Sequence, residues 1–242
     1  MPNSSWGFAR WVVLGLPPFF FLVAIVAASV WVVSTGITDS NGVASTVANA
    51  TPWLLLTVQV LMLGLLALVW RFERIDQPGP GWQLQTDQTW RSEIILGAAI
   101  GLTLAILYGL ALEPMLIWLQ QTLGDYVPAG ELWPSLGASL LPFFVANVVL
   151  APLVEESLYR GYALPRLIAR FGKPAALVIH AIAFGLLHWS GGFWYMLLTG
   201  ILAGGLFAWL ALTRRQIITS YAAHLALNLV EFGFVAWTVW QR

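Results

Sequence analysis

Long apolar runs separated by short polar stretches are the dominant pattern of this sequence. A helix that crosses a bilayer needs roughly 20 mostly apolar residues. Seven stretches meet this requirement, and they lie at about 11–35, 52–70, 94–119, 135–164, 174–190, 193–213 and 216–240. The pattern predicts an all-α fold, a polytopic transmembrane helix bundle of about seven spans. Pro17 and Pro18 fall inside the first stretch and should disturb its first turn.

The composition agrees with a membrane protein and excludes several other classes. Charged residues make up 9% of the chain and apolar residues 59%, whereas soluble domains carry roughly a quarter charged residues. The absence of Cys from the sequence excludes disulfides, zinc–thiolate sites, iron–sulfur clusters and cysteine nucleophiles. Basic and acidic residues balance at 11 each, so no net charge favours a nucleic-acid partner. The lipid bilayer is the partner that the composition predicts.

The basic residues predict the orientation of the bundle, because Lys and Arg collect in cytoplasmic loops. The loops at 36–51, 120–134 and 191–192 contain no Lys or Arg. The opposite side of the predicted bundle holds Arg10, Arg71, Arg74, Arg91, Arg166, Arg170, Lys173, Arg214 and Arg215. We therefore expect the amino terminus inside and the carboxyl terminus outside.

A Pro- and Gly-rich loop at about 75–90 is the one substantial cytoplasmic loop that the pattern predicts. It divides the chain into residues 1–93, with two front transmembrane helices and this loop, and residues 94–242, with the rest of the helical bundle. No separate soluble domain is predicted.

Ionisable and amide side chains gather in the predicted spans four to seven. Such groups are costly inside a bilayer, and they usually face a bundle interior or a water-filled cavity. The centres of the first two spans carry no charge, so the chemistry is predicted to lie in the back half. The residues concerned are Asn147, Glu155, Glu156, Arg160, His180, His188, His224, Asn228 and Glu231.

The adjacent pair Glu155 and Glu156 is the strongest single signal. Glu156 and Arg160 lie four residues apart on one helical face and can pair, whereas Glu155 points about 100° away and can face a site. A structural ion pair with a spare carboxylate is the alternative reading. Two adjacent glutamates inside a bilayer are hard to explain by structure alone.

The histidines are weak evidence singly, since a lone buried His is more often a hydrogen-bonded core residue. His224, Asn228 and Glu231 share one helical face that should turn toward the same interior as Glu155. We favour a structural or supporting role for His180. Span six carries a set of small residues, Gly200, Gly204 and Gly205, which favours close helix packing.

Three short motifs follow one another along spans four to seven. They read Glu155-Glu156-Ser-Leu-Tyr-Arg160 followed by Gly161, then Phe184-Gly-Leu-Leu-His188, then His224-Leu-Ala-Leu-Asn228. This order resembles the CPBP family of intramembrane proteases, which includes the CAAX prenyl endopeptidases and the bacterial Abi-type immunity and bacteriocin-processing proteins. The resemblance covers about 135–232, and the first three spans, which vary in such families, lie outside it.

The resemblance implies an intramembrane endopeptidase that hydrolyses a peptide bond of a membrane-associated protein or peptide. The catalytic residues that it implies are Glu155, Glu156, Arg160, His188, His224 and Asn228. Glu155 would act with His188 to activate a water, His224 and Asn228 would stabilise the oxyanion, and the Glu–Arg pair would hold the helix geometry. General-base and oxyanion-hole chemistry use these side-chain types. The expected cavity opens toward the cytoplasm.

The sequence allows two cofactor states for this site. Two His and a Glu could hold Zn²⁺ with one position left for water, with Glu155, His188 and His224 as candidates, so a metalloendopeptidase and a metal-free glutamate peptidase both stay possible. We expect the plasma (inner) membrane of a prokaryote. The alternatives are a catalytically idle immunity or scaffold protein, a proton-coupled transporter and a haem-binding protein. Substrate identity, prenylation and oligomeric state are not predicted.

Overall fold

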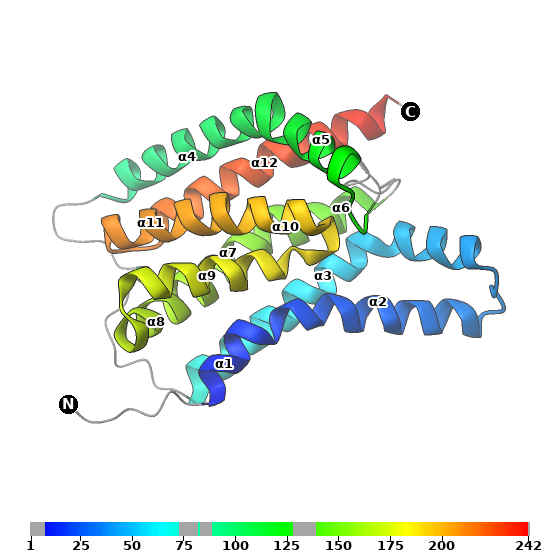
Figure 1. Ribbon diagram of the computed structural model, residues 1–242, viewed down its shortest axis with the longest axis horizontal. Coiled ribbons are helices and arrows are strands. Elements are labelled where there is room, and N and C mark those ends of the chain that lie inside the picture. Colours follow the sequence, from blue (N-terminus) through cyan, green and yellow to red (C-terminus); the bar gives the residue numbers. More distant parts are fainter. Residues whose placement is uncertain (1–7, 73–81, 83–88, 128–138, 242) are drawn as a thin grey trace.

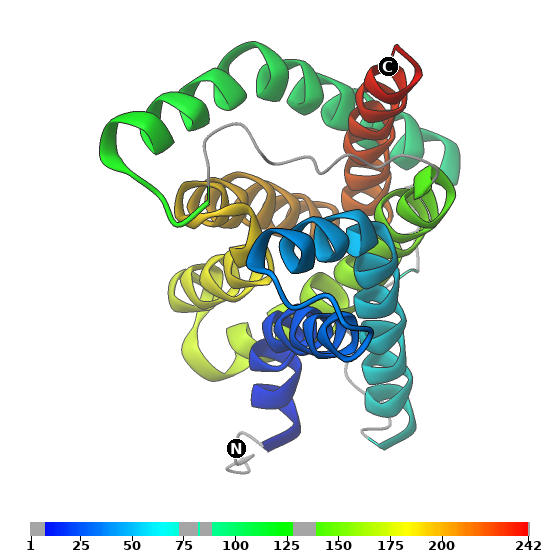
Figure 2. The same cartoon turned by 90° about the vertical axis from the view of Figure 1, so that its right-hand side faces the viewer.

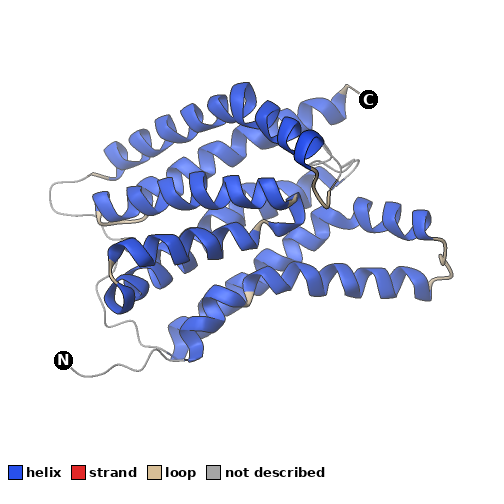
Figure 3. Ribbon diagram, viewed as in Figure 1, coloured by secondary structure: helices blue, strands red, loops and turns tan. Residues whose placement is uncertain are grey.

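The computed structural model describes residues 8–72, 82, 89–127 and 139–241, and these residues form helices and connecting turns (Figures 1 and 3). Within these described ranges, six helices are long and apolar enough to cross a membrane. The six run over Pro17–Ser34, Ser40–Arg71, Trp90–Leu123, Leu140–Phe171, Phe193–Arg214 and Ile218–Trp237. The chain is therefore an integral, multi-pass, all-helical membrane protein. The Pro- and Gly-rich loop lies almost wholly outside the described residues.

The predicted fifth span forms a shorter helix than expected. It is Lys173–Leu187, which has 15 residues. At 1.5 Å per residue this helix is too short for the roughly 30 Å hydrocarbon core. All seven apolar stretches thus form helices, and six of these are full-length spans.

The helices are numbered in chain order, and several spans are composites of two or more of them. The front part contains α1 (Phe8–Gly15), α2 (Pro17–Ser34) and α3 (Ser40–Phe72). The third span combines α4 (Trp90–Leu107), η1 (Tyr108–Leu112) and α5 (Glu113–Leu123). The fourth combines α6 (Leu140–Phe143), η3 (Phe144–Leu150), α7 (Ala151–Glu155), η4 (Glu156–Ala163) and α8 (Leu164–Phe171). The remainder is α9 (Lys173–Leu187), η5 (Trp189–Gly191), α10 (Phe193–Thr199), η6 (Gly200–Gly204), α11 (Gly205–Arg214) and α12 (Ile218–Trp240).

Two helix boundaries in the front part follow from local chemistry. The first apolar stretch breaks between α1 and α2 at Pro17, as expected for a residue that cannot donate a helical hydrogen bond. Helix α3, which contains the second predicted span, begins at Ser40, well before its apolar run. It begins there because Asp39 Oδ1 accepts a hydrogen bond from the backbone N–H of Gly42 at 2.7 Å. Hydrophobicity marked only the apolar part of this helix.

Prolines also explain the π-helical turns η1, η3 and η4 in the third and fourth spans. The α5, α7 and α8 segments have Pro114, Pro152 and Pro165 in their first turn, and each follows directly on a π-helical segment. A proline inside a continuous helix removes one i→i−4 hydrogen bond and displaces the preceding carbonyl. The π-helical turn absorbs that displacement, and such turns often occur at functional sites.

The helix ends lie at two opposite ends of the bundle (Figure 1). The start of α4, the α8–α9 connection and the end of α11 share one end, whereas the α2–α3 and α9–α10 connections share the other. This arrangement agrees with the predicted grouping of basic loops. Which end faces the cytoplasm stays a prediction.

Close helix contacts surround the centre of the bundle. A Cβ at Gly200 would lie 2.6 Å from the Ala181 carbonyl oxygen, so α9 and η6 approach each other backbone to backbone. A Cβ at Gly101 would overlap the Ala223 carbonyl oxygen, so α4 and α12 also approach each other backbone to backbone. The end view shows α4 and α5 arching over α12 and the α10–α11 helices (Figure 2).

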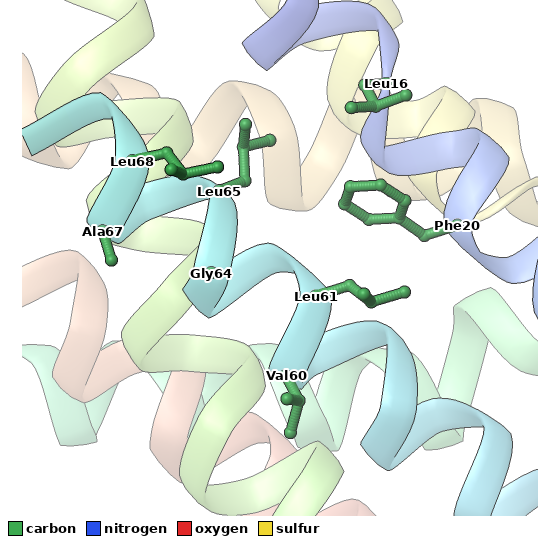
Figure 4. Close-up of a pocket in the computed structure, with 8 residues that line it drawn as sticks. All are labelled: Leu16, Phe20, Val60, Leu61, Gly64, Leu65, Ala67 and Leu68. Carbon is green, nitrogen blue, oxygen red and sulfur yellow. The ribbon is translucent and has the colours of Figure 1, made fainter. Parts of the chain in front are cut away.

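The front helices α2 and α3 enclose an open apolar hollow of about 560 Å³ (Figure 4). Its lining includes Leu16 and Phe20 on one side and Leu61, Leu65 and Leu68 on the other. All of these side chains are hydrocarbon, as expected where a bundle surface meets lipid.

Candidate active site

The two adjacent glutamates lie where α7 passes into η4, and both are buried. Glu156 is fully buried and pairs with the equally buried Arg160, with Arg160 Nη1 3.1 Å from Glu156 Oε1. Arg160 also donates from Nη2 to the Ala203 carbonyl oxygen at 3.1 Å, and its guanidinium carbon lies 4.0 Å from the centre of the Phe184 ring. The predicted Glu156–Arg160 pair is therefore confirmed.

His224 of α12 lies between the two glutamates. Its Nδ1 is 3.0 Å from Glu156 Oε1, and its Nε2 is 4.0 Å from Glu155 Oε2. Phe207 packs against the imidazole with ring centres 5.2 Å apart. Because a carboxylate only accepts hydrogen bonds, the bond to Glu156 places a hydrogen on Nδ1. The Nε2 atom is then the one directed at Glu155.

Asn228 and Glu231 meet a common partner, which confirms that they share one face of α12. Asn228 Nδ2 donates to the Asn147 carbonyl oxygen at 2.7 Å, and Asn147 Nδ2 donates to Glu231 Oε2 at 2.9 Å. These bonds tie α12 to η3. They use one of the two amide hydrogens of Asn228 and leave the other free for a ligand.

His188 follows the last residue of α9, where that helix ends. Its Nδ1 lies 2.9 Å from the Phe184 carbonyl oxygen, which leaves Nε2 as its second polar atom. Its ring also packs against Phe184 and Tyr195, with ring centres 4.9 and 6.1 Å apart. Among the described residues, direct contacts join the predicted groups of α7, η4 and α12, whereas the place of His188 beside Glu155 stays a prediction.

His180 stands apart from this group. It is fully buried, and its ring stacks on Phe184 with an interplanar angle of 3° and meets Tyr159 edge-on. Neither ring nitrogen has a hydrogen-bond partner within the described ranges. These contacts agree with the structural role expected from its position.

Gln59 of α3 is a contact that sequence reasoning missed. Its side chain is 7% exposed, and Nε2 donates to Glu155 Oε1 at 3.1 Å. The available signal was a single amide within the apolar run from Trp53 to Trp70. Glu155 is thus flanked by Gln59 on one oxygen and by His224 near the other.

A second missed cluster lies at the start of α12 and is structural. The carboxylate of Glu93 is 1% exposed. It accepts from Arg214 Nε at 3.0 Å and from Gln216 Nε2 at 2.9 Å, with Arg214 Nη2 and the Thr219 hydroxyl as further donors. This cluster ties the start of α4 to the α11–α12 connection.

Zinc binding by Glu155, His188 and His224 stays a prediction from the sequence. Across the described ranges, no group of three or more His, Cys, Asp or Glu side chains is arranged to hold one. The Nδ1 atoms of His188 and His224 are engaged by a carbonyl and a carboxylate respectively, and a histidine held in this way presents its Nε2 to a water or another ligand.

Comparison with known proteins finds a family model that matches part of this helical core. Residues 137–230 match the family of type II CAAX prenyl endopeptidase Rce1-like proteins. The resemblance drawn from the three motifs is thereby confirmed over that segment, which contains both glutamates, Arg160, His188, His224 and Asn228. The match indicates a CAAX-protease-like hydrolase that acts on a membrane-associated substrate. No curated protein and no solved structure matched the chain.

Proposed function

We propose that this protein is an intramembrane endopeptidase that hydrolyses a peptide bond of a membrane-associated protein or peptide, with Glu155 as general base. The observation that carries the proposal is the environment of this carboxylate. It is 4% exposed within the matched segment. One oxygen is bound by Gln59, and the other lies beside His224.

The proposed reaction begins with proton transfer from a water to Glu155 Oε2, and the water oxygen then forms a bond to the peptide carbonyl carbon. The carbonyl oxygen becomes an oxyanion in the tetrahedral intermediate. Collapse of the intermediate breaks the carbon–nitrogen bond, and Glu155 returns its proton to the departing amine. A positioned acid–base group of this kind contributes roughly 10²–10⁴-fold in rate. His188 assists from its free Nε2 side by orienting the water.

The oxyanion is assigned to donors on α12. Asn228 retains one amide hydrogen after its bond to Asn147, and His224 donates from Nε2 when both of its ring nitrogens carry hydrogen. Fixed donors cost no reorganisation as charge develops, and one such donor is worth roughly 10²–10³-fold. The Glu156–Arg160 pair supports this arrangement by holding the Nδ1 side of His224.

The decisive experiment compares new peptide termini in membranes from cells that make the wild-type protein or Glu155→Ala. Glu113→Ala is the matched control, since Glu113 is an acidic residue of the neighbouring span outside the proposed site. Termini that occur with wild type and with Glu113→Ala, but not with Glu155→Ala, are the expected result, and they also name the substrate. Equal termini in all membranes at equal protein levels would favour an idle scaffold or a transporter. Fractionation of the same cells tests the proposed plasma-membrane location.

A further inference from the structure

The front helices contribute a polar group to a site that is otherwise made by the back half. Gln59 lies on α3, 96 residues before Glu155 in sequence. The family match begins at residue 137, so Gln59 lies outside it. Since the chemistry was expected from the back half alone, this contact changes which part of the chain the site requires.

Packing on both sides of the bond sets the position of Gln59. Val58 and Met62 flank it on α3, and Val154 and Leu158 flank Glu155 on the partner helix. These four residues are almost fully buried and belong to one hydrophobic cluster. Close packing leaves α3 little freedom to slide or turn against α7. The amide is therefore held opposite the carboxylate.

The hydrogen bond makes the two oxygens of Glu155 different. Oε1 accepts from Gln59 Nε2 at 3.1 Å. Oε2 has no hydrogen-bond partner in the described part of the chain and lies 4.0 Å from His224 Nε2. A carboxylate held at one oxygen can turn less, so its other oxygen keeps a constant direction. That direction is toward the α12 donors.

We propose that Gln59 is a positioning residue, which holds the Glu155 carboxylate so that Oε2 is presented to the attacking water. The carbonyl oxygen of Gln59 is also buried and has no partner among the residues that the structure describes. This inference rests on the proposed function and adds that the peptidase site is incomplete without α3.

The test uses the full chain in phospholipid vesicles and a synthetic peptide that spans the cleavage site found by the terminal-peptide comparison. Gln59→Met removes the amide donor and nearly keeps the side-chain volume. We expect kcat to fall by about 10-fold, with KM unchanged, because a misplaced reacting group costs rate rather than binding. Gln59→Asn is the second variant, since it stays polar but is one methylene too short to reach Glu155.

Gln216→Met is the matched control. It removes the same kind of buried bond, from an amide to the Glu93 carboxylate at 2.9 Å, away from the proposed site. It should lower the unfolding temperature and keep the wild-type kcat per folded molecule.

The outcomes separate this inference from the proposed function. An unchanged kcat in Gln59→Met and Gln59→Asn would overturn the role of Gln59 and leave proteolysis standing. An equal loss of kcat in Gln216→Met would assign Gln59 to helix docking alone. Failure of the wild-type protein to cleave any peptide would remove the proposed function, and this inference with it.

Discussion

His224 and Arg160 contact the same oxygen atom of Glu156. Nδ1 of His224 lies 3.0 Å from Oε1, and Nη1 of Arg160 lies 3.1 Å from it. The fully buried Glu156 thus joins η4 to α12 through one atom. Its neighbour Glu155 is left to face the site, which gives the two adjacent glutamates different roles.

Replacing Arg160 should destabilise the protein as well as inactivate it. Arg160→Ala leaves the carboxylate of Glu156 buried without a countercharge, and breaking a buried pair in this way typically costs about 3–5 kcal/mol. Thermal unfolding in lipid nanodiscs measures the loss. Arg166→Ala is the control, because Arg166 is only partly buried, and its loss should cost much less. Unchanged unfolding of Arg160→Ala would mean that the pair does not stabilise the bundle.

Replacing Glu155 or His188 should abolish cleavage while the protein still inserts and folds. Neither side chain is part of the Glu156–Arg160 pair, and both carry hydrogen-bonding atoms that are left for a water or substrate. We expect Glu155→Ala to lose at least about 10²-fold in rate, the lower range for a general base. Size-exclusion profiles and unfolding temperatures close to wild type are the control. Wild-type turnover by Glu155→Ala would exclude Glu155 from the mechanism.

The parts of this structure that follow from sequence are those with a local signature. Apolar runs predicted the helices, and the high cost of intramembrane charge singled out Glu155, Glu156, Arg160 and His224. The short length of α9 and the early start of α3 at Ser40 were not predicted from the sequence. An apolar run shows which residues contact lipid or core, but it does not show where the helical hydrogen bonds begin. The π-helical turns were not predicted either, because the placement of Glu155 about 100° from Glu156 assumed a regular α-helix.

The missed contacts are those made between distant segments. Gln59 has an uncharged amide, which a membrane helix tolerates at modest cost. Its presence in the sequence therefore does not indicate that it contacts Glu155. Glu93 lies near the start of its helix, where a carboxylate is usually assigned to the interface. Its partners Arg214 and Gln216 lie more than 120 residues away, and local periodicity contains no information on such pairs.

Breaking the Glu93 cluster should loosen the bundle and leave the proposed chemistry intact. Glu93→Ala removes the buried carboxylate that joins Arg214 and Gln216 to the start of α4 and leaves the Gln216 amide with Thr219 as its acceptor. Loss of a hydrogen bond to a charged group costs about 1.5–3 kcal/mol. We expect a lower unfolding temperature with an unchanged cleavage rate per folded molecule. The exposed neighbour Arg91→Ala should change neither quantity. A wild-type unfolding temperature for Glu93→Ala would show that the cluster does not hold the helix ends together.

Asp125 should make the stability of the protein depend on pH in the acidic range. Partial burial raises the pKa of this carboxyl, but hydrogen bonds from the backbone N–H groups of Phe193 and Tyr126, at 2.8 and 2.7 Å, outweigh burial and hold the pKa below its ordinary value. A lowered pKa in the folded state means that the stabilisation is complete above the unfolded pKa of about 3.9 and is lost as the pH falls through the folded value. The unfolding temperature of wild type should therefore drop more steeply below about pH 4 than that of Asp125→Asn, which cannot titrate. Parallel curves for the two proteins would show that the connection between α5 and α10 gains nothing from the charge.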